Sequence, residues 1–320
     1  MTDTFRHEAF LYSSEPEFLA GTVPFIRGGL SAEEPVLVVE SAERIALLRS
    51  ALGSDAGRVV FADMAVVGSN PARIIPAWHD FVAENGAGGK RLRGIGEPIW
   101  RERSADELVE CQRHESLLNV AFAGGQAWSL LCPYDTERLD AGVIAEARRS
   151  HEYVSQAGAS MLSTDFRGVV ASGAPFGAPL PEPAAPPRTI DFDGGTLLAL
   201  RREVTRFAMS AGMRVAQATE LVTSVNEVAT NSLLHGGGRG VLRLWRQQGT
   251  VVAEVRDGGR YGHPLGDREK PGAGTRDGRG LWLANQLCDL VQIRTLGEGN
   301  VVRLQMNLRP PSRLHLVSTD

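Results

Sequence analysis

The segment ASGAPFGAPLPEPAAPPR, residues 171–188, constrains the fold of this chain more than any other feature. Prolines recur through it among alanines and glycines, with few large apolar side chains. Such a composition favours a semi-rigid linker over a packed helix or strand. The length of 320 residues also exceeds what one hydrophobic core usually needs. We therefore predict a first domain over residues 1–170, a second over 189–310, and a tail over 311–320.

Composition and charge argue against two kinds of partner. Hydrophobic residues make up 42% of the chain and charged residues 22%, which is ordinary for a soluble globular protein. No apolar run approaches the roughly 20 residues that span a bilayer, and the N-terminus does not resemble a signal peptide. We therefore expect a cytoplasmic protein without membrane contact. A net charge of -4 provides no broad basic surface, so no direct contact with nucleic acid is expected.

The cysteines and histidines form no metal-binding motif. Cys111, Cys132 and Cys288 are scattered and include no CxxC pair, so we predict that they are reduced, buried thiols. The sequences HESLL, from His114, and HEYVS, from His151, lack the second histidine of a zinc-binding helix. The sequence therefore predicts no metal site in the first domain.

Strand-like and helix-like segments alternate through the first domain. Continuously apolar runs such as VLVVE and WSLLCPY are typical of strands that helices cover on both faces. Amphipathic stretches such as ARIIPAWHDFVAE separate them. This order predicts an α/β fold with a doubly wound, parallel sheet. The GGK at residues 88–90 is followed by Arg91, so the domain lacks a recognisable phosphate-binding P-loop.

Helices and hairpins are grouped in the second domain. The apolar periodicity predicts helices over residues 196–212, 218–236 and 278–290, and hairpins over 240–259 and 291–308. Helices beside antiparallel hairpins predict a two-layer α/β sandwich.

Three polar stretches of the second domain are candidates for one site. Glu227 and Asn231 lie one turn apart on the polar arc of the expected helix, a pattern that on its own is most often a solvated face. Asp257 ends a strand and precedes two glycines, which allow a ligand to approach the backbone closely. The glycine-rich loop PGAGTRDGRG, with Arg276 and Arg279, then opens a helix, an arrangement that favours phosphate oxygens.

The order of NEVATN, RDGG and GRGLWL resembles the N, G1 and G2 boxes of the GHKL ATP-binding fold. The short form over residues 190–308 most resembles the bacterial anti-sigma serine kinases. This resemblance implies that Asn231 binds Mg²⁺, that Glu227 is the general base for a partner's serine, and that residues 260–277 form a mobile lid. It implies further nucleotide contacts by Asp257 at the adenine amino group, by Gly259 at the base, and by Arg276, Gly278, Arg279, Gly280 and Leu281 around the phosphates.

One departure from the family pattern keeps other functions open. The chain reads DGGRYG, so Tyr261 stands where the family usually has another glycine. A non-catalytic module that binds nucleotide and sequesters its partner therefore remains an alternative. The sequence HEYVSQ raises a second alternative, a sensor histidine kinase phosphorylated on His151. Against it, the proline of that box is missing, and residues 157–188 cannot form the second long helix of such a kinase.

The first domain resembles, more loosely, the sensory domain named for methanogens, methylotrophs and the dichloromethane regulator. The matching stretches are HEAFLYSSEPEF, FIRGGLSAEEPVLVV, GEPIW, ECQRHESLLN and LLCPYD. The resemblance implies a RecA-like sheet that has lost its phosphate loop and senses a ligand or a partner. The residues expected near such a pocket, or else in buried hydrogen bonds, are His7, Tyr12, Glu97, Glu115, Cys132 and Tyr134.

Together, these features predict a sensory anti-sigma regulator. The second domain would bind ATP and Mg²⁺, phosphorylate a serine of a STAS-type anti-sigma antagonist, and bind a sigma factor. The first domain would respond to a small-molecule or protein signal. A homodimer is implied by the related kinases alone.

Overall fold

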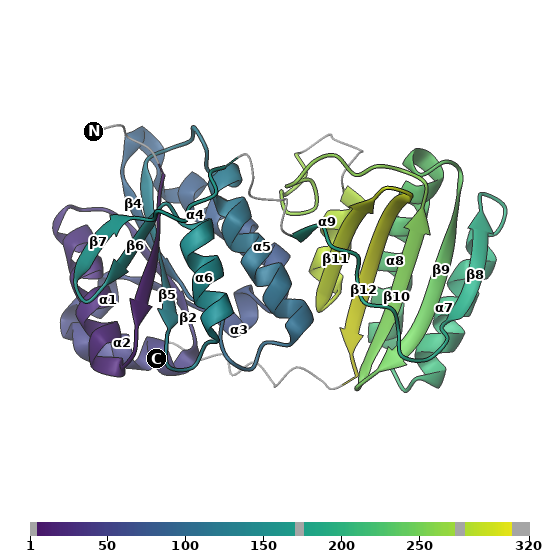
Figure 1. The fold of residues 1–320 in the computed structure, drawn as a ribbon, viewed down its shortest axis with the longest axis horizontal. Helices are drawn as coiled ribbons and strands as arrows, with labels where there is room; N and C mark the ends of the chain where they lie inside the picture. Colours follow the sequence, from purple (N-terminus) through teal and green to yellow (C-terminus); the bar gives the residue numbers. More distant parts are fainter. Residues whose placement is uncertain (1–4, 170–175, 273–278, 309–320) are drawn as a thin grey trace. The chain divides into compact units, whose positions relative to one another are not determined.

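The computed structural model describes residues 5–169, 176–272 and 279–308. The chain divides into two compact units, Met1–Phe176 and Gly177–Asp320, and each unit has its own sheet (Figure 1). Among the described helices, none is both long and apolar enough to cross a bilayer.

A seven-stranded sheet with the order β3-β2-β4-β5-β1-β6-β7 forms the centre of the N-terminal unit. Its neighbouring strands pair in parallel, except for the antiparallel hairpin of β6 and β7 at one edge. The parallel, doubly wound sheet predicted from the sequence is thereby confirmed. The strands are β1 (Arg6–Tyr12), β2 (Val36–Glu40), β3 (Val60–Asp63), β4 (Leu92–Gly96), β5 (Trp128–Asp135), β6 (Tyr153–Gln156) and β7 (Ala159–Leu162).

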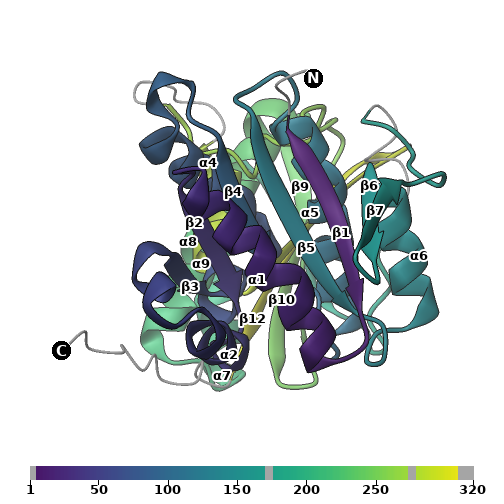
Figure 2. The ribbon, with the colours of Figure 1, turned by 90° about the vertical axis from the view of Figure 1, so that its left-hand side faces the viewer.

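Helices cover both faces of this sheet. Figure 2 shows α1 and α2 on one face, while α5 and α6 lie on the other. Local signals fix where they begin: a capping box between Ser104 and Glu107 opens α5, and the Ser14 side chain caps α1. The helices are α1 (Glu15–Ser31), α2 (Ala42–Leu52), α3 (Met64–Val67), α4 (Ile74–Asn85), α5 (Ala105–Ala121) and α6 (Ala141–Ser150), with short 3-10 turns η1 (Gly53–Arg58), η2 (Pro71–Arg73) and η3 (Ala87–Gly89).

The C-terminal unit is a five-stranded antiparallel sheet with helices packed against it, as the predicted two-layer sandwich requires. The strand order is β11-β12-β10-β9-β8. Val251, Ala253 and Val255 alternate along β10 and belong to the core between the layers, so Asp257, two residues further on, falls on the helix side. The elements are β8 (Arg188–Asp193), α7 (Leu197–Ser210), α8 (Val215–His235), β9 (Arg239–Gln247), β10 (Thr250–Asp257), α9 (Arg279–Leu287), β11 (Leu290–Leu296) and β12 (Gly299–Asn307).

The other face of this sheet carries a buried ion-pair network. Glu254 is fully buried and lies between its cross-strand neighbours Arg243 and Arg303, with carboxylate–guanidinium distances of 2.7 and 2.6 Å. Two residues of the predicted linker complete the network: Pro181 accepts a hydrogen bond from Arg303, and Glu182 pairs with Arg243. The predicted linker therefore contacts the sheet at Pro181 and Glu182.

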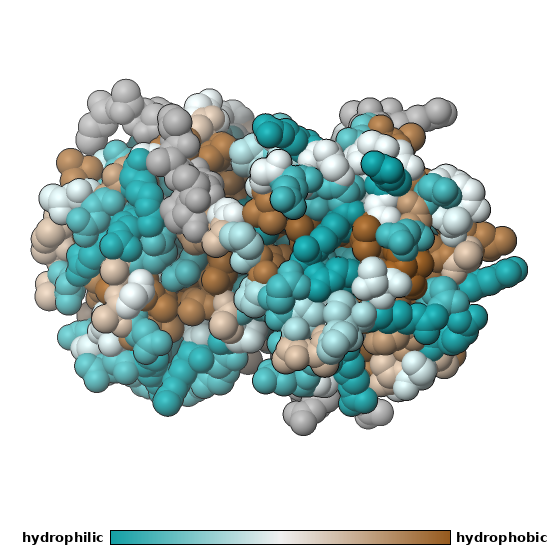
Figure 3. All heavy atoms as spheres, turned by 45° about the vertical axis from the view of Figure 1, so that its right-hand side comes forward, coloured by the Kyte–Doolittle hydropathy of each residue, from teal (hydrophilic) through white to brown (hydrophobic). Residues whose placement is uncertain are grey.

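Hydrophilic residues predominate on the face of the C-terminal unit that is turned forward in Figure 3, with smaller hydrophobic areas between them. Such a mixture is ordinary for an outer protein surface. Unlike charges on such a surface, the buried charges of the network depend on their pairing.

Glu254→Gln should lower the free energy of unfolding by about 3–5 kcal/mol, because it leaves the buried Arg303 guanidinium without its countercharge. Glu182→Gln is the control, since its side chain is 62% exposed and a surface pair contributes at most about 1 kcal/mol. Urea unfolding of the full chain, followed by circular dichroism, measures both. Equal, small losses in the two variants would contradict the structural role of Glu254.

Candidate functional site

The start of α9 packs against the middle of α8. A Cβ atom added at Gly280 would lie 3.1 Å from the Glu227 carboxylate and 3.2 Å from the Asn231 carboxamide. Both α8 side chains are half-buried. Any side chain at position 280 would therefore require Glu227 and Asn231 to shift by a few tenths of an ångström, whereas glycine requires no shift. The fold therefore brings two of the three polar stretches singled out in the sequence into contact.

Three donors hold the Asp257 carboxylate at the end of β10. The Ser232 hydroxyl donates to Oδ2 over 2.6 Å, and the Gly259 N–H and the Asn300 carboxamide donate to Oδ1 over 2.8 and 3.2 Å. An ionised carboxylate offers about four acceptor positions. About one acceptor position therefore remains for a donor such as an exocyclic amine.

The backbone around Asp257 is also close-packed against the end of α8. The Gly258 N–H donates to the Gly236 carbonyl, and a Cβ at Gly236 would lie 2.6 Å from the Asp257 carboxyl carbon. Because Ser232 and Gly236 are the last turn and the cap of α8, the third polar stretch also meets this helix.

Of the remaining predicted contact residues, Arg279, Gly280 and Leu281 lie at the N-terminus of α9. Arg279 is exposed, while Gly280 and Leu281 are buried. A helix N-terminus presents free N–H groups and partial positive charge, which suit an anionic ligand. Arg276 and Gly278 lie outside the described residues.

A cavity of about 740 Å³ borders Asp257 and Gly258 at one end of the sheet. The residues that line it come from β8, β9, β10 and the β11–β12 turn, and they do not include Glu227, Asn231 or Gly280. We therefore do not assign this cavity to the ligand that the three polar stretches would share.

The described part of the predicted lid, residues 260–272, is hydrogen-bonded to the sheet and to α9. The Tyr261 N–H donates to the Asn300 carboxamide oxygen, and the Tyr261 backbone carbonyl accepts from the Thr295 hydroxyl. Further on, Asp267 is buried and accepts hydrogen bonds from Asn285 of α9 through its backbone and carboxylate oxygens. The tyrosine that departs from the family pattern thus belongs to a segment tied to β11, β12 and α9.

In the N-terminal unit, Tyr12 and Glu97 meet at the carboxyl ends of the parallel strands. The tyrosine hydroxyl donates to Glu97 over 2.8 Å and accepts from Arg44 over 3.0 Å. Glu40, at the end of β2, is buried nearby, and these groups line a cavity of about 360 Å³. Ligands of open α/β sheets bind at this edge.

Glu40 and Glu97, two of the carboxyl groups that line this cavity, have raised pKa values. Burial is the main cause that raises the pKa of Glu97 from 4.5 to about 7. Burial and the neighbouring charge of Glu97 raise the pKa of Glu40 well above its usual range. The cavity therefore holds at least one neutral carboxylic acid at neutral pH.

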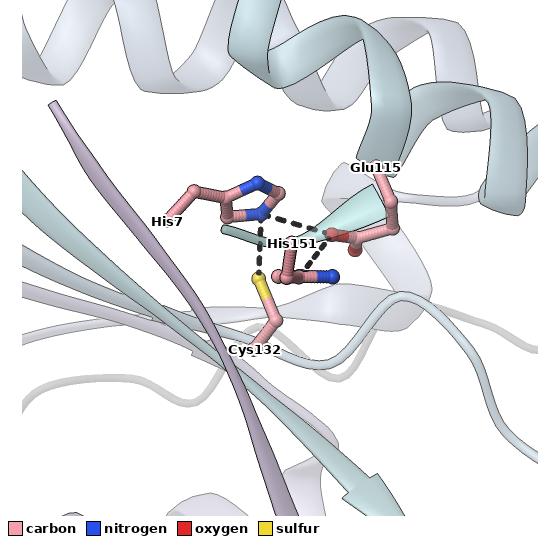
Figure 4. A group of neighbouring side chains, drawn as sticks. All are labelled: His7, Glu115, Cys132 and His151. Atoms are coloured by element: carbon pink, nitrogen blue, oxygen red, sulfur yellow. Dashed lines mark hydrogen bonds and ion pairs between the residues drawn. The ribbon is translucent and has the colours of Figure 1, made fainter. Parts of the chain in front are cut away.

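His7, Glu115 and Cys132 gather elsewhere, in a cluster completed by His151 (Figure 4). All four side chains are at most 1% exposed. Burial and the neighbouring His151 lower the pKa of His7 to about 4. Although burial opposes it, contact with His151 and His7 keeps the pKa of Glu115 below its usual range. Tyr134 packs edge-on against His151, with ring centroids 5.7 Å apart.

Comparison with protein families covers both units. Residues 6–152 match the MEthanogen/methylotroph, DcmR Sensory domain (MEDS), and residues 193–306 match the Histidine kinase-like ATPase domain. The chain joins a MEDS domain to a histidine kinase-like ATPase domain. The resemblance of the first domain to the MEDS domain, and that of the second to the GHKL ATP-binding fold, are thereby confirmed.

Similarity to one solved structure is low in sequence identity and in coverage of either chain. The crystal structure of the RsbU and RsbW domains of Rv1364c from Mycobacterium tuberculosis matches 39% of this chain at 21% identity, with a TM-score of 0.31. The match covers 34% of that chain, about a third of its length. No curated protein matches.

The structure divides the six residues expected near a MEDS pocket into two groups. Tyr12 and Glu97 line the cavity, whereas the other four lie in or against the buried cluster. The partners Arg44 and Glu40 were not anticipated, although Glu40 ends the buried strand VLVVE and Arg44 follows it by four residues. In the ATPase domain, Ser232 and Asn300 were also missed.

Glu97→Gln should change how the stability of the MEDS domain depends on pH. The folded-state pKa of Glu97 is raised, so its stabilising effect is present below about pH 4.5 and is lost as the pH rises through about 7. At about 1.4 kcal/mol per pKa unit, the wild type should lose about 3 kcal/mol relative to the variant between pH 4 and pH 8.

Urea unfolding at the two pH values measures this difference. Glu102→Gln is the control, because Glu102 borders the same cavity but is exposed. Parallel pH profiles for the wild type and Glu97→Gln would show that Glu97 does not titrate in this range.

Proposed function

We propose that the ATPase domain binds ATP with Mg²⁺ and phosphorylates a serine of a STAS-type anti-sigma antagonist, and that it also binds a sigma factor. The MEDS domain would adjust this activity to a signal. The observation that supports the proposal most is the contact of Gly280 with Glu227 and Asn231. This contact brings together the stretches that resemble the N and G2 boxes. Asp257, in the stretch that resembles the G1 box, accepts a hydrogen bond from Ser232 of the same helix, α8.

The residues present suit a magnesium nucleotide. The spare acceptor position of Asp257 matches the adenine amino group, and the carboxamide of Asn231 offers a hard oxygen ligand for Mg²⁺. Bound Mg²⁺ would neutralise charge on the phosphates. Arg279 and the N–H groups at the start of α9 would hold phosphate oxygens.

Glu227 would take the proton of the incoming serine. In the transfer, a bond forms between the serine oxygen and the γ-phosphorus, and the bond from the γ-phosphorus to the bridging oxygen breaks, so that ADP leaves. The hydroxyl proton passes to the Glu227 carboxylate. Such a base contributes about 10² to 10⁴ in rate.

A non-catalytic module that holds ATP and sequesters its partner is the second candidate. The observation that favours it is Tyr261, whose backbone is tied to Asn300 and Thr295 at a position where the family usually has glycine. A sensor histidine kinase is disfavoured, because His151 is fully buried and a phospho-acceptor has to be reached by the kinase domain.

Glu227→Ala should reduce phosphoryl transfer by about 10² to 10⁴ while ATP still binds, because only proton removal is lost. The measurement is transfer of label from ATP to the antagonist, beside calorimetric titration with ATP. Glu220→Ala is the control, a carboxylate two turns earlier on the same arc of α8. Undiminished transfer by Glu227→Ala would exclude this base, and absence of transfer by the wild type would favour sequestration.

Asn231→Ala should weaken magnesium-dependent ATP binding by at least about tenfold. Even loss of an outer partner in a metal site costs about 10–100-fold in metal affinity, and Asn231 is expected to bind the ion directly. Calorimetry with ATP, with and without Mg²⁺, measures the effect. Asn226→Ala, about 140° around the same helix, should bind as the wild type does. Equal affinities for Asn231→Ala and the wild type would contradict the metal role.

A further inference from the structure

Four side chains from distant parts of the MEDS domain converge in its core. His7 comes from β1, Glu115 from α5, Cys132 from β5, and His151 directly follows α6 (Figure 4). Their ligand atoms all lie within 4.8 Å of one another. Three of the separations are short: His7 Nε2 lies 3.1 Å from Glu115 Oε2 and 3.4 Å from Cys132 Sγ, and His151 Nε2 lies 3.1 Å from Glu115 Oε2.

The outer hydrogen bonds determine which nitrogen of each imidazole faces the cluster with a lone pair. His151 Nδ1 lies 2.8 Å from the Ala147 carbonyl, which can only accept, so Nδ1 carries the proton. His7 Nδ1 lies 3.1 Å from Asn119 Oδ1, and the Asn119 nitrogen donates to the Ser150 carbonyl. The carboxamide oxygen therefore accepts from His7. In the neutral form of each ring, Nε2 therefore points inward as an electron-pair donor.

The interior of the cluster consequently has an excess of electron pairs. With both rings neutral, two imidazole nitrogens and a carboxylate face one another, and the only proton among them is that of the Cys132 thiol. Among the described residues, Glu115 Oε1 and His151 Nε2 are buried without a partner in hydrogen-bond geometry. Buried acceptors left in this state are costly, and a cation at the centre would satisfy all of them.

We propose that His7, Glu115, Cys132 and His151 bind a divalent transition-metal ion, with zinc the best fit. Thiolate and imidazole donors select zinc over calcium or magnesium. Tetrahedral ligands at about 2.0–2.3 Å from zinc lie about 3.3–3.8 Å apart, close to the short separations in the cluster. The acceptors behind both Nδ1 atoms are the outer shell that metal-bound histidines usually have. The thiol releases its proton to solvent as the metal–sulfur bond forms.

The site is a closed one. Four protein ligands leave no position for water or substrate, which is characteristic of structural zinc sites. The ion would link β1, β5, α5 and the α6–β6 junction to one another through its four ligands. This role is separate from the nucleotide site, so each proposal can fail without the other.

Metal analysis of the full-length chain, produced in zinc-supplemented and in cobalt-supplemented cells, tests the proposal. We expect one zinc ion per chain, and in the cobalt protein a thiolate-to-cobalt charge-transfer band with tetrahedral ligand-field bands. Cys132→Ala and His151→Gln should lose the metal. Cys111→Ala is the matched control, since Cys111 is a buried thiol of the same domain that donates to the Pro98 carbonyl outside the cluster.

Wild-type protein with far less than one metal ion per chain would overturn the proposal, as would a cobalt spectrum without thiolate charge transfer. Neither result depends on the folding of a variant. Equal metal content in Cys132→Ala and Cys111→Ala would also overturn it.

Discussion

The absence of a side chain at Gly280 is the constraint on which the proposed site depends. Because α9 starts without a Cβ at this point, its N-terminus reaches the carboxylate and carboxamide of α8. The same helix ends at Ser232 and Gly236, which hold Asp257 and its loop. One helix therefore contacts two other segments that are well separated from it in the sequence, and we propose that the polar arc of α8 serves as a site rather than as a solvated face.

In the MEDS domain, the polar side chains described above lie in two separate places, a cavity and a buried cluster. Tyr12, Glu40 and Glu97 lie at the carboxyl edge of the sheet, around a cavity of a size that admits a small molecule. The histidine and cysteine cluster is closed and buried. The cavity suits the binding of a small-molecule signal, and the buried cluster suits a structural role in stabilising the fold.

The sequence predicted the features that depend on local patterns. The apolar run VLVVE is a fully buried strand, and the hairpin turns and the helix with Glu227 lie where periodicity indicated. It did not predict β8 or the β6–β7 hairpin, because both are short and largely exposed and have little apolar alternation. It also did not bring His151 together with His7, since 144 residues separate them and only the fold makes them neighbours.

Calorimetric titration of the full chain with ATP and Mg²⁺ tests the central claim most directly when wild type is compared with Gly280→Val and Gly297→Val. A side chain at Gly280 would enter the space of Glu227 and Asn231, whereas one at Gly297 would meet nothing within 4 Å. We predict that wild type and Gly297→Val bind equally and that Gly280→Val, with its melting temperature retained, does not bind. Absence of binding by the wild type, or equal affinity in Gly280→Val, would contradict a nucleotide site built around this glycine.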